Sequence, residues 1–247
     1  MTPELHISPS PPALAEEAAQ RFATLASAAI EARGRFVVAL SGGSTPKVLL
    51  GLLAQPPYRD ALAWDFVHIA WGDERCVPPD DAQSNYRMAR EALLAHVPIP
   101  ALNIHRMPAE NPNHEIAAAE YAATLRALFG LAASALPRFD LIHLGLGTEG
   151  HTASLFPGSP ALRERERLVA APWVEKLNAH RITVTPPVLN AAREVHFLVA
   201  GAEKADIVRD ILHSPHNPDE LPAQSVAPSD GRLVWLLDTA AAAKLER

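Results

Sequence analysis

The stretch LGLGTEGHTASLFPG contains the side chains best suited to chemistry, because it places a carboxylate two positions before a histidine on a glycine-rich segment. The histidine is His151 and the carboxylate is Glu149. An imidazole titrates near neutral pH and can take a proton from a reacting group, while a neighbouring carboxylate can orient the ring and fix its tautomer. We take both residues as candidate catalytic residues; the alternative is a histidine that makes only a structural hydrogen bond.

The glycines of this stretch also spell G-x-G-x-x-G, at Gly145, Gly147 and Gly150. A dinucleotide-binding fingerprint needs a strand before these glycines and a helix after them, within a βαβ unit that carries a ribose-binding acid. Here Pro157 and Pro160 leave room for about two turns of helix at most, and no such unit is evident. We therefore interpret the glycines as a compact loop that presents the histidine.

A second group of charged residues follows another predicted strand, in WGDERCVP. It places Asp73, Glu74 and Arg75 in succession on a loop punctuated by proline. Such a run is often a solvated turn, but at the carboxyl end of a strand its charges would also suit a reaction site. We take Asp73 and Arg75 as further candidate catalytic residues.

The segment SGGSTPK, residues 41–47, follows a strand and opens a helix. Thr45 occupies the expected N-cap position and Pro46 the first helical position. Paired glycines let the backbone approach a ligand closely, and the free N–H groups of a helix start favour an anion. The spacing excludes a Walker P-loop, although an ordinary tight turn would fit equally well. The candidate anion-binding residues here are Gly42, Gly43, Ser44 and Thr45.

The formal net charge of -6 means that an anionic ligand needs cations placed close to it, because the field of the whole chain repels it. Arg181 stands at the start of a predicted strand, and Lys204 lies in the first turn after another. A lysine at a helix start opposes the helix dipole, so an anion held at that end would stabilise it. We take both as candidate anion-binding residues. Lysine and arginine are otherwise dispersed, which argues against nucleic acid as a partner.

The composition is that of a globular protein. The 247 residues, 48% hydrophobic and 20% charged, fit one α/β domain over 1–247. Cys76 is the single cysteine, so no intramolecular disulfide or cysteine zinc site can form, and the 11 histidines show no H-E-x-x-H spacing. We find neither a signal sequence nor a run of about 18 apolar residues. We expect a soluble cytoplasmic protein with no metal site and no membrane partner.

Short, almost continuously apolar runs alternate with helical patterns along the chain. The predicted strands are 35–41, 66–73, 139–147, 193–201 and 231–238, and the predicted helices are 12–33, 46–55, 84–95, 113–130 and 203–213. This alternation predicts an α/β fold with an open, doubly wound, mostly parallel sheet and helices on both faces. Ligands bind beyond the carboxyl ends of such strands. We expect the site in the loops after Leu40, Trp71, Leu144 and Val199.

Five segments together resemble the 6-phosphogluconolactonase family, in the same order and over nearly the whole chain. They are LSGGSTPK, WGDERCVPPDDAQSNYRMAREALL, LGLGTEGHTASLFPG, RITVTPPVLNAAREVHFLVAGAEKA and a late PAQSV. The resemblance implies an open α/β fold akin to that of the glucosamine-6-phosphate deaminases. It also implies hydrolysis of 6-phosphogluconolactone to 6-phosphogluconate, the second step of the oxidative pentose phosphate pathway, without a metal or an organic cofactor.

The resemblance also implies roles for the candidate residues. His151 would activate water for attack on the lactone carbonyl and then protonate the departing ring oxygen, while Asp73 and Glu149 would line the reacting end. Arg75 or the backbone N–H groups of 145–150 would stabilise the oxyanion. The sequence departs from the family at Glu149, where the family more often has aspartate. The residues that would hold the 6-phosphate are Gly43, Ser44, Thr45, Arg181 and Lys204.

Other functions compete with this prediction. A glucosamine-6-phosphate deaminase shares the glycine cradle and a Gly-His loop, but deaminases read more like G-H-I-A-F-N-E-P where this chain has GHTASLFP. A non-catalytic sugar-phosphate sensor would need the cradle but not His151, and such sensors usually carry a DNA-binding segment. A serine esterase needs G-x-S-x-G, which Ser41, Ser44 and Ser154 do not form.

Overall fold

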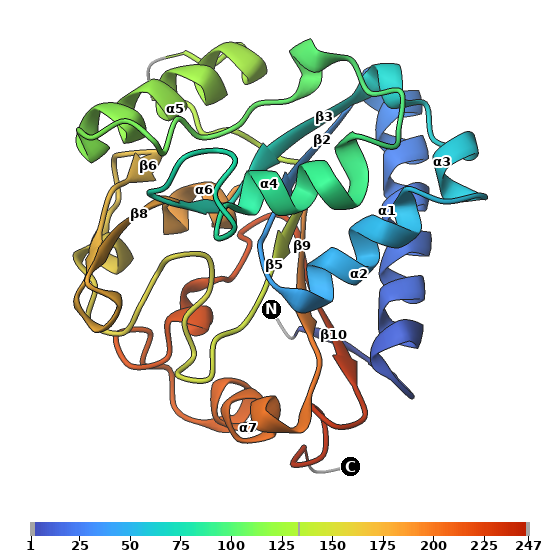
Figure 1. Ribbon diagram of the computed structural model, residues 1–247. Helices are drawn as coiled ribbons and strands as arrows, with labels where there is room; N and C mark the ends of the chain where they lie inside the picture. The colour runs from blue at the N-terminus through green and yellow to red at the C-terminus, as the bar shows by residue number, and fades with distance from the viewer. Residues whose placement is uncertain (1–2, 133, 246–247) are drawn as a thin grey trace.

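A parallel sheet of six strands runs through the molecule in the computed structural model, which describes residues 3–132 and 134–245 (Figure 1). From edge to edge the strands are β1 (Glu4–Ser8), β10 (Arg232–Asp238), β9 (Glu194–Val199), β5 (Leu141–Leu144), β2 (Phe36–Leu40) and β3 (Val67–Trp71). Every neighbouring pair is parallel. Strands were expected at the other five positions but not at β1, whose partner β10 lies at the opposite end of the chain.

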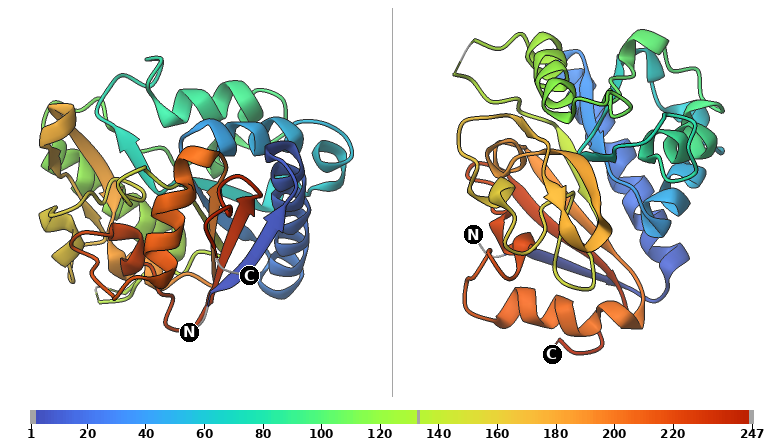
Figure 2. Two further views of the ribbon diagram at one scale, coloured as in Figure 1. Left: turned by 90° about the horizontal axis from the view of Figure 1, so that it is seen from below. Right: turned by 60° about the vertical axis from the view of Figure 1, so that its left-hand side comes forward.

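Helices cover both faces of this sheet. They are α1 (Pro11–Arg33), α2 (Ser44–Leu53), α3 (Tyr58–Ala61), α4 (Asn85–Ala89), α5 (His114–Phe129), α6 (Pro186–Asn190) and α7 (Ala205–His213). The chain crosses the sheet in one direction from β1 to β2 and β3, and returns from β3 through β5 and β9 to β10. Because crossovers between parallel strands are right-handed, α1 and α2 lie on one face and α5 and α7 on the other (Figure 2). The predicted doubly wound sheet is confirmed.

Shorter helical turns connect these elements. The helix predicted over 84–95 is divided, because α4 continues as a π-helical turn, Arg90–Leu94. The Ser84 hydroxyl caps α4 by accepting a hydrogen bond from the backbone N–H of Arg87. The 3-10 turns are η1 (Trp64–Phe66), η3 (Ala101–Asn103), η4 (Pro160–Arg163), η5 (Glu175–Leu177), η6 (Ala202–Lys204) and η7 (Pro222–Ser225).

A small antiparallel sheet packs beside the main one, against α5. Its strands are β4 (Asp73–Arg75), β8 (Ala179–Val184) and β6 (Val169–Ala170), and β7 (Trp173–Val174) pairs with the start of β8. The prediction of a loop at 73–75 is therefore wrong. The reason is long-range pairing: three charged residues carry no strand pattern of their own, and their hydrogen-bonding partner lies about a hundred residues later.

The core fills the space between the main sheet and the helices. All five side chains of β2 are buried, as expected for a strand covered on both faces. Trp71, Phe139 and Trp235 are fully buried within the core. Among the described residues, no helix is both long and apolar enough to cross a membrane. The prediction of a single domain over 1–247 stays a prediction.

The topology creates a crevice between β2 and β5. These strands are neighbours, yet the helix after β2 lies on one face of the sheet and the chain after β5 leaves toward the other. Their following loops diverge, and ligands bind at such switch points in open α/β sheets. The two loops nearly touch, because a Cβ atom placed on Gly145 would lie 3.8 Å from the carbonyl oxygen of Gly42.

Candidate active site

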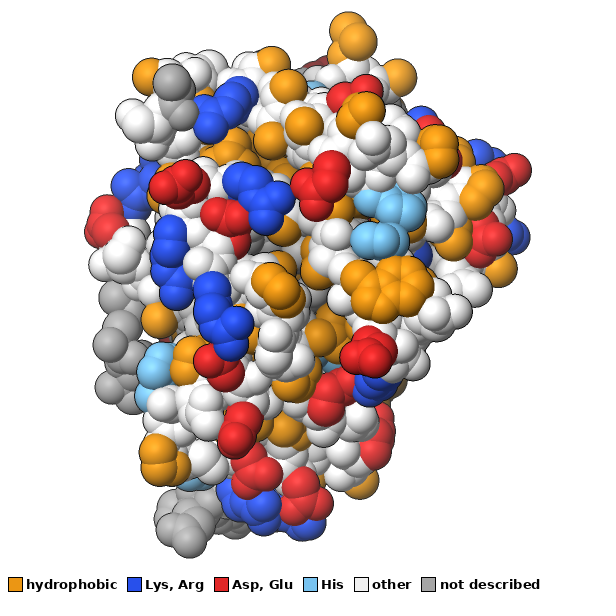
Figure 3. Space-filling view, turned by 90° about the vertical axis from the view of Figure 1, so that its left-hand side faces the viewer, with side chains coloured by type: hydrophobic (Ala, Val, Ile, Leu, Met, Phe, Trp, Pro, Cys, Tyr) orange, Lys and Arg blue, Asp and Glu red, His pale blue; other side chains and the backbone are white. Residues whose placement is uncertain are grey.

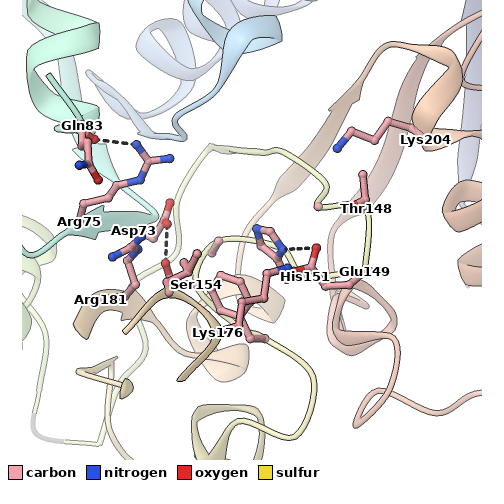
Figure 4. Close-up of a pocket in the computed structure, with 14 residues that line it drawn as sticks. Asp73, Arg75, Gln83, Thr148, Glu149, His151, Ser154, Lys176, Arg181 and Lys204 are labelled. Carbon is pink, nitrogen blue, oxygen red and sulfur yellow. Dashed lines mark hydrogen bonds and ion pairs between the residues drawn. The ribbon is translucent and has the colours of Figure 1, made fainter. Parts of the chain in front are cut away.

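A cavity of about 470 Å³ opens beyond the carboxyl ends of the strands, at this crevice (Figure 4). A smaller cavity of about 70 Å³ shares Asp73, Arg75 and His151 with it and extends the space to Gly42 and Gly145. The sequence prediction did not include several residues that line the larger cavity: Gln83, Ser154, Phe156, Lys176 and Leu177.

The glycines after β5 build a loop that fits around His151. The N–H of Gly147 donates to the carbonyl of His151 at 2.8 Å, and the N–H of Gly150 donates to the carbonyl of Gly147 at 3.0 Å. Gly150 has a φ of +84°, a conformation that favours glycine. A Cβ atom on Gly147 would lie 1.9 Å from the imidazole Nδ1, so the histidine ring occupies the space that only glycine leaves open.

His151 lies between Glu149 and an aromatic ring. Its Nδ1 is 3.0 Å from Oε2 of Glu149, so the carboxylate lies in close contact with this edge of the ring. The imidazole stacks on Phe156 with ring centroids 4.2 Å apart. Burial lowers the pKa of His151, although the charges of Glu149 and Asp73 oppose the shift. The imidazole is therefore mainly neutral at pH 7, the form that can accept a proton.

Glu149 is held by a cation that the sequence prediction missed. Lys176, on η5, forms an ion pair with Oε1 of Glu149, while Oε2 faces the histidine. Burial opposes ionisation, but Lys176 and the backbone hydrogen bond of Glu149 outweigh it and lower the pKa of Glu149 to about 2. The carboxylate is ionised at neutral pH. No motif marks Lys176, because it reaches the site through the β7–β8 hairpin.

Strand β4 carries the second set of charged residues into the cavity. Side chains alternate along a strand, and Asp73 and Arg75 line the cavity. The Ser154 hydroxyl donates to Oδ2 of Asp73 at 2.7 Å, with both side chains buried. Arg75 stands opposite Arg181 in the β4–β8 register. Two cations at directly opposed positions repel each other, so an anion bound beside them would stabilise this pairing.

Glu74 points the other way and fixes the position of α4. Its buried carboxylate accepts hydrogen bonds from the backbone N–H groups of Asn85, at 2.7 Å, and Tyr86, at 2.8 Å. Asn85 in turn fills the space beside Gly42, where a Cβ atom would lie 1.9 Å from its Oδ1. The close packing explains why glycine stands at position 42, and it places the loop after β2 next to β4.

The SGGSTPK segment differs from its prediction at the start of α2. Helix α2 begins at Ser44 with Gly43 as its N-cap, so the prediction of Thr45 as N-cap is wrong. Gly43 adopts a φ of +112°, which lets the chain turn into the helix before Thr45 is reached. Gly42 lines the smaller cavity, whereas Gly43, Ser44 and Thr45 line neither. Their role in anion binding stays a prediction.

Two groups of cations face the larger cavity. Figure 4 shows Arg75 and Arg181 on one side of His151 and Lys204 on the other. Burial and the charge of Arg75 lower the pKa of Arg181, which still keeps its charge at neutral pH. No group of three or more His, Cys, Asp and Glu side chains in 3–132 and 134–245 is arranged to hold a metal ion. The site therefore offers a neutral base, an ionised carboxylate and cations for an anionic small molecule.

The fold and this site define an α/β protein with its binding cavity at the topological switch point of a parallel sheet. A sequence model of the family described as glucosamine-6-phosphate isomerases/6-phosphogluconolactonase matches residues 9–235. The chain belongs to this family, which confirms the resemblance drawn from its sequence.

Individual proteins support the same assignment. The chain is 43% identical over 245 residues to a 6-phosphogluconolactonase of Synechocystis, covering 99% of each chain. A crystal structure of a devB protein superimposes with a TM-score of 0.90 at 37% identity, covering 98% of this chain and 99% of that one. The 6-phosphogluconolactonase from Trypanosoma cruzi gives a TM-score of 0.87 at 28% identity, covering 100% and 99%.

Proposed function

We propose that this protein hydrolyses 6-phosphoglucono-1,5-lactone to 6-phosphogluconate, and so acts in the oxidative pentose phosphate pathway. The observation that carries the proposal is the state of His151: a neutral imidazole faces a cavity that also contains an ionised carboxylate and several cations. These are the groups that a water-dependent attack on an anionic lactone requires. The similarity to 6-phosphogluconolactonases over 99% of the chain supports the same substrate.

In the proposed mechanism His151 acts twice. Nδ1 is buried beside Glu149, so the other edge of the ring, which carries Nε2, is available to water. Nε2 takes one proton from water as its oxygen attacks the lactone carbonyl carbon. The tetrahedral intermediate then collapses, the bond from the carbonyl carbon to the ring oxygen breaks, and the imidazolium returns the proton to that oxygen. The ionised Glu149 stabilises the imidazolium between the two steps.

Charged groups around the base would hold the rest of the substrate. Arg75 or the backbone N–H groups of 145–150 stabilise the oxyanion, and Asp73 lines the reacting end. The 6-phosphate is held by Arg181 and Lys204, together with the backbone of the loop from Gly42 to Thr45. Electrostatic support for this assignment comes from the opposed arginines of β4 and β8, whose repulsion a phosphate would relieve.

The activity is tested by following the loss of freshly generated 6-phosphogluconolactone at neutral pH, corrected for spontaneous hydrolysis. We expect the wild type to accelerate the reaction and His151→Ala to lose about 10²- to 10⁴-fold in kcat. The matched control is His213→Ala, an exposed histidine on α7. An inactive wild type would reject the proposal, and release of ammonia from glucosamine 6-phosphate would then assign a deaminase. Full activity in a folded His151→Ala protein would reject the mechanism alone.

The phosphate assignment has its own test. Arg181→Ala and Lys204→Ala should raise KM for the phosphorylated lactone much more than for glucono-1,5-lactone, which lacks the phosphate. Charge-assisted contacts of this kind are each worth about tenfold or more in affinity. Equal effects on both lactones would remove that residue from the phosphate site.

A further inference from the structure

A second large cavity, of about 370 Å³, lies at the amino ends of β2, β5 and β9. His151 lies beyond the opposite, carboxyl ends of the strands. Four arginines line this second cavity, with one acidic side chain, Asp140, and an apolar wall that includes Phe129. We call it the arginine cavity and define it by Arg33, Arg35, Arg138 and Arg193. Such a group of like charges needs an explanation, because the chain as a whole carries a net charge of -6.

Asp140 cannot account for these cations by itself. Its carboxylate is 2.8 Å from Nη2 of Arg33 and 3.4 Å from Nε of Arg193, and it also accepts a hydrogen bond from the backbone N–H of Val37. One negative charge is thus shared between two guanidinium groups, and the carboxylate also binds the backbone. The cavity keeps an excess of positive charge.

The other two arginines have partners that are weak or uncharged. Arg138 forms an ion pair with Asp230, but the side chain of Asp230 is 88% exposed, so water and salt screen the pair. Arg35 donates to the carbonyl of Leu128 at 2.9 Å, near the end of α5. Arg35, and Arg33 in the last turn of α1, also interact favourably with helix C-termini. Arg138 and Arg193 come from connecting segments, where helix dipoles do not explain them.

The arginines also disfavour one another. Burial, followed by the charges of Arg33 and Arg138, lowers the pKa of Arg193. On the face of the molecule drawn in Figure 3, by contrast, Lys and Arg side chains are interspersed with Asp and Glu. A bound anion would relieve the repulsion in the arginine cavity, since each guanidinium can bind a phosphoryl group through two parallel hydrogen bonds.

We propose that the arginine cavity binds a small organic anion that carries two phosphoryl groups. Its volume is in the range of small-molecule sites, and more than one guanidinium is available for each phosphoryl group. Phe129, Leu131 and Leu136 provide apolar surface for the organic part of the ligand. Because the cavity and the crevice of His151 lie at opposite ends of the strands, the two sites bind their ligands separately.

The probe for this proposal is pyrophosphate, measured by titration calorimetry at constant ionic strength. The starting protein carries Arg181→Gln and Lys204→Gln, so that two cations of the candidate active site are removed. We expect one pyrophosphate to bind per chain in this protein. Adding Arg138→Gln and Arg193→Gln should weaken binding about a hundredfold, or about tenfold for each lost charge-assisted contact. The matched control adds Arg163→Gln, an exposed arginine paired with Asp219 outside the cavity.

Several outcomes would overturn the proposal. They are no binding at millimolar pyrophosphate, unchanged binding in the Arg138/Arg193 variant, and equal weakening by the Arg163→Gln control. If the variant with Arg138→Gln and Arg193→Gln fails to fold, Arg193→Lys in the same starting protein replaces it. This substitution keeps the positive charge but removes the planar guanidinium group, and we expect it to weaken pyrophosphate binding several-fold. ADP tests the apolar wall, because it adds an organic part to the same diphosphate. It should bind at least as tightly as pyrophosphate, and weaker binding would contradict an organic ligand.

Discussion

A glutamate is followed two positions later by a histidine at three places in the chain, and two of these pairs have contrasting surroundings; the third is Glu4 and His6, near the start of the chain. Glu149 and His151 lie on the glycine loop after β5, and the His151 side chain is 28% exposed to the cavity. Glu194 and His196 lie on β9 in the middle of the sheet, where the His196 side chain is 0% exposed and its Nε2 is 2.7 Å from Oε1 of Glu194. In both pairs burial lowers the histidine pKa.

The difference between the pairs lies in what surrounds them. Glu194 is also held by Arg232 at 3.2 Å, and both line a separate cavity of about 340 Å³ beside α1. His196, however, packs against His143 on the neighbouring strand and is fully buried, so its imidazole cannot meet a substrate. His151 meets a cavity because β5 ends before it and glycines carry the chain around its ring. The two pairs share their residue types and their spacing. They differ in that His151 follows the end of a strand and faces the cavity, whereas His196 lies within a strand and is buried.

Replacing each histidine by alanine should give the largest contrast. We expect His151→Ala to lose about 10²- to 10⁴-fold in lactonase kcat with less than about 1 kcal/mol change in the free energy of unfolding. We expect His196→Ala to lose about 2–4 kcal/mol of that free energy, because it leaves a void and removes a buried hydrogen bond to a carboxylate. Its folded fraction should keep nearly wild-type kcat/KM. Denaturant unfolding and lactone assays on both variants check this, and the reverse pattern would contradict the assignment of the two pairs.

Gly147→Ala should change the position of the His151 ring without removing any ionisable group, and we expect it to have the next largest effect on kcat. The added Cβ would lie 1.9 Å from Nδ1 of His151, so the imidazole must move although every ionisable group remains. We expect kcat to fall by about 10²-fold, because misplacement of a reacting group by about 1 Å has that cost. Gly51→Ala, on α2 where a Cβ has open space, is the control. Wild-type kcat in Gly147→Ala would show that the ring position is not required.

The sequence was sufficient for the elements that local patterns specify. Buried strands such as β2 and β9 read as apolar runs. His151, on the loop after β5, lines the cavity together with Asp73 of β4 and Arg181 of β8. The glycine loop could be interpreted because Pro157 and Pro160 leave too little room for the helix that a dinucleotide site needs after G-x-G-x-x-G.

Strand β4 and Lys176 were missed because both depend on contacts between distant residues. Strand β4 forms only because β8 offers hydrogen bonds to it, and that pairing brings Arg75 opposite Arg181. Lys176 reaches Glu149 from η5, the turn of the β7–β8 hairpin, with no motif in its own segment. Glu149 stands where the family more often has aspartate, and in the structure its two oxygens contact Lys176 and His151 separately.

The stability of the protein should depend on pH through the buried histidines. Burial holds the pKa values of His143 and His196 below 6.5 in the folded state, although Glu194 opposes the shift for His196. Below about pH 6.5 the unfolded chain therefore binds protons that the folded chain does not, and the free energy of unfolding falls by up to about 1.4 kcal/mol per pH unit for each histidine. Denaturant unfolding at pH 7.5 and 5.5 should show this loss, with a smaller loss in His143→Leu. An equal loss in that variant would assign the effect to other groups.

The smallest expected effects are opposite shifts in the pH dependence of the reaction. The free enzyme needs neutral His151, so kcat/KM should rise with pH through the histidine pKa and then level off. The charge of Glu149 raises this pKa and the charge of Lys176 lowers it. Glu149→Gln should therefore move the acid limb of the profile to lower pH, and Lys176→Met should move it to higher pH. Lys244→Met, which removes an exposed lysine paired with Asp206, should leave the limb in place. Two shifts in the same direction would mean that these side chains act on His151 through its position and not through their charge.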